Sequence, residues 1–181
     1  MCGCAAQVPR DNPMDGLEIV YFGDRASPVT IWFQDQDYQE WVGKFAGGTS
    51  MGTALHRVSM VSECEAFVSA KGAGYFVDIN GRRNARSPIQ TDFHDMIFHR
   101  PSGVIVGVDH TAVHFLNRAG EKISTVELGL DEMRLTGIDG DHVTGSYNSL
   151  SAEDGDEAVV WHRFKVDPIT RTVKGFEVDQ A

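Results

Sequence analysis

The sequence predicts a mainly β protein in which antiparallel strands form a meander, a β-sandwich or propeller-like sheets, with one α-helix at about residues 35–45 packed on them. Three observations support this fold class. Short runs of β-branched and aromatic residues recur along the chain, turn residues separate them, and apolar residues show helical spacing in one segment. A chain of 181 residues is also long enough to bury a hydrophobic core.

The chain is predicted to begin with a flexible arm, residues 1–15, which contains Pro9 and Pro13 and shows no periodicity. Residues 16–181 are then predicted to form a single β-rich domain. If that domain is subdivided, the division is expected near 81–92, where a polar loop follows a turn signal.

Leu17–Phe22 and Val29–Phe33 are apolar strands, and the turn residues between them predict a first hairpin. The period changes at residues 35–45, where apolar side chains three and four apart lie on one helical face and Asp35 or Asp37 serves as the N-cap. The apolar face of this predicted helix consists of Tyr38, Trp41, Val42 and Phe45.

The stretch Phe93–Leu128 is predicted to form a four-stranded antiparallel meander. Turn residues at 100–103, 109–110 and 117–120 separate its β-forming runs. The predicted strands are Ile97–Phe98, Val104–Val108, Thr111–Leu116 and Ile123–Leu128. Three less regular strands are predicted before the meander: Leu55–Val61, Ala66–Ala70 and Tyr75–Ile79.

Part of this meander, GVIVGVDHTAVHFLNRAGEKI at 103–123, resembles a blade element of a β-propeller. The resemblance implies short antiparallel strands in one sheet and assigns no functional residue. After it, the acidic stretch 149–157 is predicted to be a loop between two hairpins. These hairpins pair Met133–Ile138 with His142–Tyr147 and Val159–Val166 with Thr172–Val178.

The three cysteines are Cys2, Cys4 and Cys64. An odd number predicts free thiols and a reducing compartment, so we expect a cytoplasmic protein. An alternative is a lipid anchor through Cys4, which requires a leader upstream of the sequence. No apolar run is long enough to cross a bilayer, so no membrane span is predicted.

The net charge of -10 is concentrated in residues 93–181, which carry -7 of it. This balance argues against nucleic-acid binding and favours a basic protein partner. The sequence therefore predicts a non-catalytic interaction module, of the inhibitor or immunity type, and no cofactor. Its predicted partner-binding residues are Glu153, Asp154, Asp156, Glu157, Asp139 and Asp141.

The alternative function is a small metal-dependent hydrolase that uses His94, Asp95 and His99, because imidazole and carboxylate groups are common metal ligands. Ser50 also lies in a G-x-S-x-G pattern, but the elements expected around it are in the reverse order to those of a nucleophile elbow. A basic cluster is formed by Arg82, Arg83 and Arg86.

Overall fold

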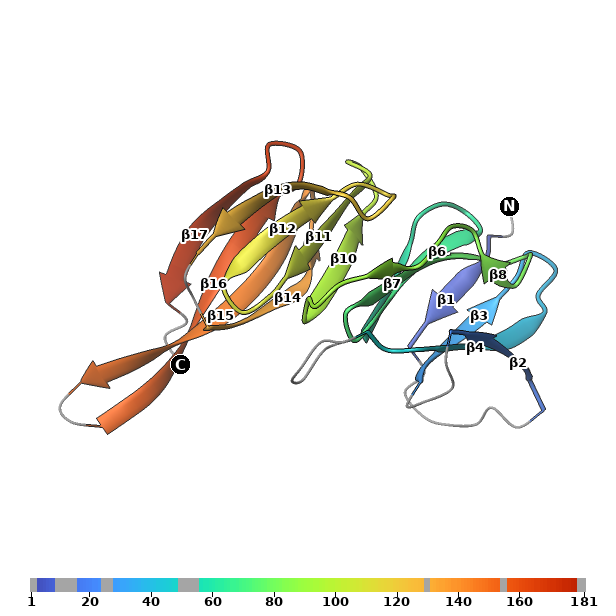
Figure 1. The fold of residues 1–181 in the computed structure, drawn as a ribbon, viewed down its shortest axis with the longest axis horizontal. Helices are drawn as coiled ribbons and strands as arrows, with labels where there is room; N and C mark the ends of the chain where they lie inside the picture. The colour runs from blue at the N-terminus through green and yellow to red at the C-terminus, as the bar shows by residue number, and fades with distance from the viewer. Residues whose placement is uncertain are drawn as a thin grey trace. The chain divides into compact units, whose positions relative to one another are not determined.

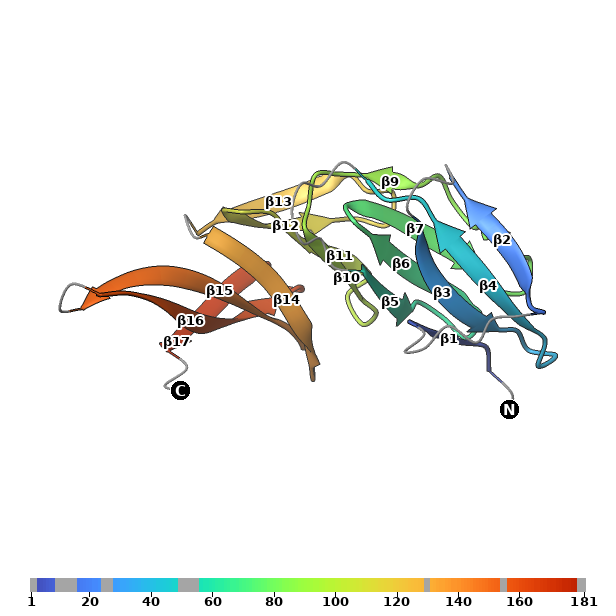
Figure 2. The same ribbon diagram turned by 90° about the horizontal axis from the view of Figure 1, so that it is seen from below.

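The computed structural model describes residues 3–8, 16–23, 28–48, 56–128, 131–153 and 156–178 (Figures 1 and 2). Within these ranges the chain is mainly β, as predicted, and contains no helix. It follows that none of the described segments is a helix able to span a membrane. The chain divides into two compact units, Met1–Phe93 and His94–Ala181.

The first unit contains two sheets. One has the strand order β1-β3-β4-β2, and the other has the order β5-β6-β7-β8 with β9 also paired to β7 (Figure 2). The strands of the first sheet are β1 Ala5–Gln7, β2 Glu18–Phe22, β3 Val29–Gln34 and β4 Glu40–Phe45. Those of the second sheet are β5 His56–Met60, β6 Glu65–Ala70, β7 Ala73–Asp78, β8 Arg83–Asn84 and β9 Ile89–Gln90.

Both sheets of the first unit contribute to one hydrophobic core. Phe33 stacks on Trp41 at 4.3 Å between ring centroids, and Phe22 stacks on Phe45 at 4.5 Å. Gly43 makes room for these rings, because a Cβ atom there would lie 2.6 Å from the Phe45 ring and 2.8 Å from the Phe33 ring. The aromatic rings of this core therefore occupy space that only a glycine on β4 leaves open.

The predicted helix at residues 35–45 is wrong. A turn leads into strand β4, whose register with β3 places Trp41 opposite Phe33 and Phe45 opposite Val29. The Asp35 carboxylate closes the turn by accepting hydrogen bonds from the backbone N–H groups of residues 37 and 39 at 3.0 and 2.9 Å. Apolar residues at 41 and 45 fit both helical and strand periods, and pairing with β3 selects the strand.

The predicted first hairpin is also wrong. Strand β2 runs parallel to β4, with Glu18 opposite Trp41 and Phe22 opposite Phe45. Strands β3 and β4 form the hairpin instead. Ala5–Gln7, within the predicted N-terminal arm, forms β1 and pairs with β3.

A disulfide joins Cys4 and Cys64, whose Cα atoms lie 5.0 Å apart. It links the residue before β1 to the turn between β5 and β6, and the Cys4 N–H also donates to the Glu63 carbonyl at 3.1 Å. The prediction of a free thiol at Cys4 is therefore wrong. A lipid anchor through Cys4 is incompatible with this bond, because both need the same sulfur atom. Cys2 lies outside the described residues.

The second unit contains two four-stranded sheets in which every neighbour in the sheet is also the neighbour in sequence. The first is the predicted meander, which is confirmed: β10 Asp95–His99, β11 Val104–Val108, β12 Ala112–Leu116 and β13 Lys122–Glu127. The second sheet contains β14 Asp131–Asp139, β15 His142–Glu153, β16 Asp156–Asp167 and β17 Thr172–Val178. The β14–β15 and β16–β17 hairpins are also confirmed.

The two sheets of the second unit share one core. Val106 and Phe115 contribute from the meander, and Leu135, Val143 and Phe164 contribute from the other sheet. The sheets of this unit are antiparallel, as predicted, and side chains from both are buried in one cluster.

The prediction of a loop at 149–157 is wrong for its described residues, because β15 and β16 extend through them. The ladder continues from Val143 opposite Val166 to Glu153 opposite Asp156 without a register shift. The strand-forming residues 158–160 supply pairing partners for 149–151, and this pairing outweighs the polar composition of the segment.

Candidate functional site

The five described residues among the six acids predicted to bind a partner lie near opposite ends of strand β15. Asp139 and Asp141 belong to the β14–β15 turn, whereas Glu153 pairs with Asp156 at the far end of the β15–β16 hairpin. Twelve residues of extended strand separate the two ends, a distance of about 36 Å at 3.3 Å per residue. The described acids therefore form two separate groups, one at each end of β15.

The far end is a two-stranded ribbon that projects beyond its sheet (Figure 1). Pairing between β14 and β15 ends at Asn148, and pairing between β16 and β17 ends at His162. The pairs from Ser149–Val160 to Glu153–Asp156 involve β15 and β16 alone in the described chain. We call these ten residues the acidic ribbon; Glu157 pairs with Ala152 within it, and Asp154 lies outside the described residues.

The acidic charge at the other end is partly compensated. Lys165 Nζ lies 3.0 Å from Asp139 Oδ2 and donates a hydrogen bond to it. This bond and the lysine charge hold the pKa of Asp139 below its usual value. Asp141 is exposed in the same turn. A basic partner would have to compete with Lys165 at this end.

The three predicted metal ligands do not converge. Asp95 is buried and accepts a hydrogen bond from the Leu135 N–H at 3.2 Å, while His99 Nδ1 lies 2.9 Å from Ser102 Oγ. Asp95 and His99 are four residues apart on β10, which separates their Cα atoms by about 13 Å. The His94 ring packs against a different residue, His110, at 4.0 Å between centroids.

No group of three or more His, Cys, Asp or Glu residues with metal-binding geometry occurs in the described ranges. The predicted hydrolase therefore lacks the ligand set on which it was based. Ser50, the other candidate catalytic residue, lies outside the described residues.

A buried polar network that sequence reasoning missed joins Asp109, His114 and Thr125. His114 Nε2 lies 2.7 Å from Asp109 Oδ2, and its Nδ1 lies 3.0 Å from Thr125 Oγ1. Burial alone would raise the pKa of Asp109, but hydrogen bonds from the Thr111 N–H, from His114 and from the Ala112 N–H outweigh it, so the pKa lies below its usual value.

The order carboxylate, imidazole, hydroxyl in this network is that of a nucleophilic triad. His114 is only 4% exposed, however, and a substrate would need access to both the imidazole and the hydroxyl. His114 and Thr125 are also direct cross-strand partners. The network is best explained as a structural tie between the β11–β12 turn and β13. The Asp109-x-Thr111 turn was its only signal in the sequence.

The basic cluster in the first unit is neutralised by its neighbours. Arg83 pairs with Asp78 at 3.4 Å, and Arg86 pairs with Glu65 at 3.1 Å. Glu65, Asp78 and Arg83 line a groove of about 650 Å³, together with Cys64 of the disulfide. Because each lining charge that is described has an opposite charge beside it, the groove favours neither anions nor cations.

Arg82 is held in the same way, by Glu18 and by Asp35, whose Oδ2 lies 3.2 Å from Arg82 Nη2. The backbone N–H of Gln39 does most to hold the pKa of Asp35 below its usual value, against the effect of burial, and Arg82 adds to it. The cluster therefore joins β2, the β3–β4 turn and the β7–β8 turn within the first unit.

The chain matches no protein-family model and no curated protein sequence. Its function must be argued from the geometry of its own residues, and the acidic ribbon is the feature that most favours binding.

Proposed function

We propose that the chain is a non-catalytic interaction module that binds a basic protein partner through the acidic ribbon, in the manner of an inhibitor or immunity-type protein. The observation that carries the proposal is the β15–β16 pairing, which continues for five pairs beyond both neighbouring strands and ends at Glu153 and Asp156. A ribbon that projects in this way is accessible to a partner from both edges.

Charge supports the same proposal. The chain has a net charge of -10, and the four acids at 153–157 make the ribbon end its densest acidic segment. Such an end accelerates encounter with a basic surface and repels acidic competitors. Asp139 and Asp141, at the opposite end of β15, form a weaker second contact region because Lys165 already binds Asp139.

The Cys4–Cys64 disulfide supports an oxidising compartment for this function, in place of the cytoplasm expected from the cysteine count. A secreted or surface-exposed module would meet its partner outside the reducing interior of the cell.

The test compares two double variants that each remove two carboxylates. Glu153→Gln with Asp156→Asn neutralises the ribbon end, and Asp139→Asn with Asp141→Asn neutralises the opposite end. Fluorescence anisotropy measures binding to a labelled octalysine peptide and to cytochrome c, a small folded basic protein, at increasing salt. We expect the ribbon variant to bind about fivefold more weakly, since two exposed ion pairs together contribute about 1 kcal/mol.

The opposite-end variant is the matched control and should lose less affinity. Equal losses in the two variants would mean that net charge alone, rather than the ribbon, attracts the probes. Wild-type binding that does not weaken as salt rises would exclude the electrostatic mechanism.

A further inference from the structure

The face of the β1-β3-β4-β2 sheet that points away from the core carries an apolar row. On β3 and β4, Trp32 and Val42 alternate with core residues and therefore lie on this face. The register places Val42 opposite Trp32 on one side and opposite Ile19 of β2 on the other. Val42 is buried, whereas Trp32 is half-buried and Ile19 is 42% exposed. We call this face the outer face; its side chains are those of Ala5, Gln7, Ile19, Tyr21, Thr30, Trp32, Gln34, Glu40, Val42 and Lys44.

Trp32 differs from the other two tryptophans of the chain. The Trp41 ring stacks on Phe33 in the core. The centre of the Trp161 ring lies 4.0 Å from the guanidinium carbon of Arg134. In the described part of the chain, neither an aromatic nor a cationic side chain packs on the Trp32 ring. This ring is therefore available to a ligand that has an apolar face.

Hydrogen-bonding side chains surround Trp32 on the outer face. Thr30 and Gln34 are two residues away along β3, and Gln7 of β1 is the register partner of Trp32. A sugar ring has the complementary surface, because its C–H groups form an apolar face and its hydroxyl groups lie around the edge. Sheet faces bind oligosaccharides in other β-rich folds.

The charges of the outer face balance. Within strands β1–β4, its charged side chains are Glu40 and Lys44, which are four residues apart on β4. The outer face therefore favours an uncharged ligand, in contrast to the acidic ribbon. We propose that the outer face binds a neutral oligosaccharide, with one sugar ring stacked on Trp32.

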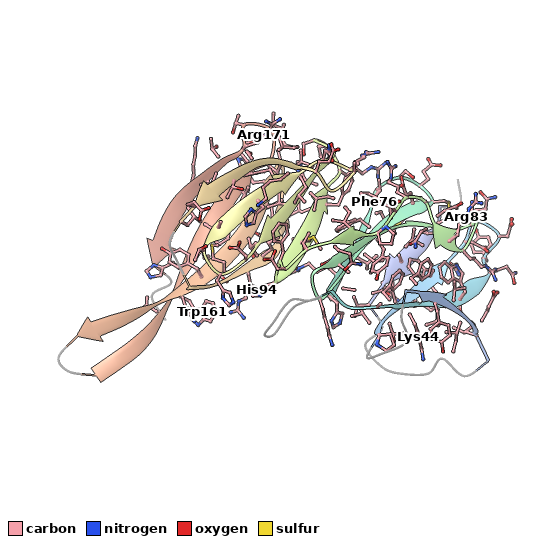
Figure 3. All side chains as sticks on the ribbon, in the orientation of Figure 1. Lys44, Phe76, Arg83, His94, Trp161 and Arg171 are labelled. Atoms are coloured by element: carbon pink, nitrogen blue, oxygen red, sulfur yellow. A yellow bond between two sulfur atoms is a disulfide. The ribbon has the colours of Figure 1, made fainter. Side chains whose placement is uncertain are left out.

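Tyr21 provides a second contact for the same ligand. Its side chain is 41% exposed, and the Nζ atom of its register partner Lys44 lies 5.9 Å from the centre of the Tyr21 ring. Lys44 lies at the lower side of the first unit in Figure 3. Two strand spacings and two residues separate Tyr21 from Trp32, so their Cα atoms lie about 12 Å apart. A ligand that contacts both rings must be longer than one sugar ring, which favours an oligosaccharide over a monosaccharide.

The size of the outer face favours this ligand over a macromolecule. Four strands about 4.8 Å apart, each with about five residues at 3.3 Å per residue, give an area of about 300 Å². A stable protein interface buries about 800 Å² on each partner. Nucleic-acid bases also stack on aromatic side chains, but their phosphates require a positive surface, and Glu40 offsets the charge of Lys44.

This site goes beyond the proposed function and belongs to the first unit, whereas the acidic ribbon belongs to the second. The Glu153→Gln and Asp156→Asn double variant should weaken binding to basic probes and leave oligosaccharide binding unchanged. Trp32→Ala should have the reverse effects, so the two proposals fail independently.

Isothermal titration calorimetry tests the proposal with five soluble neutral hexasaccharides, built from glucose, mannose, xylose, galactose and N-acetylglucosamine. At least one should bind, and Trp32→Ala should weaken its binding by about tenfold or more through loss of the stacking surface. Tyr21→Ala should weaken it by about threefold, since Tyr21 makes the second contact. Trp161→Ala is the matched control and should leave the affinity unchanged, because this half-buried tryptophan already packs against Arg134 in the other unit.

Trp32→Phe retains a flat ring and should keep most of the affinity, which separates loss of stacking from misfolding of Trp32→Ala. Failure of all five hexasaccharides to bind at millimolar concentration overturns the proposal. Binding that Trp32→Ala leaves unchanged overturns it as well. Binding of single-stranded oligothymidylate that is lost in Trp32→Ala, without binding of any hexasaccharide, would assign the face to nucleic acid and also overturn it.

Discussion

The two units of the molecule form β-sheets by different routes. In the second unit every pairing within a sheet joins strands that are neighbours in sequence. In the first unit the sheet order β1-β3-β4-β2 requires a parallel pairing between β2 and β4 across the intervening strand β3. Local pairing costs little loop entropy, whereas non-local pairing costs more and forms more slowly.

The two units also differ in the features that stabilise them. The first unit has the Cys4–Cys64 disulfide and an aromatic core around Phe33 and Trp41. The second unit contains no cysteine, and its core is rich in valine. The first unit, whose strand pairing is non-local, is therefore stabilised by a covalent link. The second unit, whose strands pair in sequence order, is stabilised by its hairpins.

The Cys4–Cys64 disulfide is the feature that should most separate the stabilities of the two units. Replacing Cys4 and Cys64 by serine should destabilise the first unit by about 4 kcal/mol, because the bond closes a loop of 60 residues in the unfolded chain. Denaturant unfolding in a Trp161→Phe background reports on the first unit alone, through Trp32 and Trp41.

Reduction of the wild-type chain by a thiol is the control and should reproduce the double serine variant. Hydrogen exchange of peptides from residues 94–181 should remain unchanged in both cases. Equal loss of protection in the two units would contradict their independence.

Both units place a glycine beneath an aromatic ring, Gly43 in the first unit and Gly145 in the second. Gly145 pairs directly with Phe164, and a Cβ atom at Gly145 would lie 2.1 Å from the Phe164 ring. Gly145→Ala should therefore destabilise the second unit by roughly 1–3 kcal/mol through overpacking. Hydrogen exchange of the second unit measures the change.

Gly137→Ala is the matched control on the adjacent strand β14, because no atom lies within 4 Å of a Cβ atom there. We expect that variant to stay within about 0.5 kcal/mol of the wild type. If both alanine variants destabilised the unit equally, backbone conformation rather than ring packing would explain the need for glycine.

The contrast between local and non-local pairing also explains what could be predicted from the sequence. The meander at Phe93–Leu128 was predictable because each of its turns has its own sequence signal. The parallel partner of Leu17–Phe22 was not predictable, because no local feature identifies a strand 23 residues further along the chain. At 35–45 the period was ambiguous, although Gly43 within a segment of aromatic residues argued against a helix.

The candidate site was predictable in part. Composition identified the acidic residues of the ribbon, but the pairing of Ala158–Val160 with residues 149–151 decides that they lie on a projecting hairpin. The disulfide was not predicted, because an odd cysteine count is also compatible with one bonded pair and one further cysteine, and the count alone does not identify the pair.

A buried histidine should make the stability of the second unit depend on pH. Burial of His99 on β10 lowers its pKa below the usual value, while Asp141 and Asp167 act to raise it and His142 acts to lower it. The unfolded chain binds a proton at this histidine near pH 6.5, and the folded unit does not. The second unit should therefore lose stability as pH falls from about 6.5 toward the lowered pKa of His99.

Hydrogen exchange of the second unit at several pH values measures this slope, and the first unit serves as an internal reference. His99→Gln removes the titrating group and retains a polar side chain near Ser102, so it should reduce the slope even if it lowers overall stability. A slope equal to that of the wild type would assign the pH dependence to other histidines of the second unit. In that case the pH dependence of stability would not report on the burial of His99 in the β10–β13 meander.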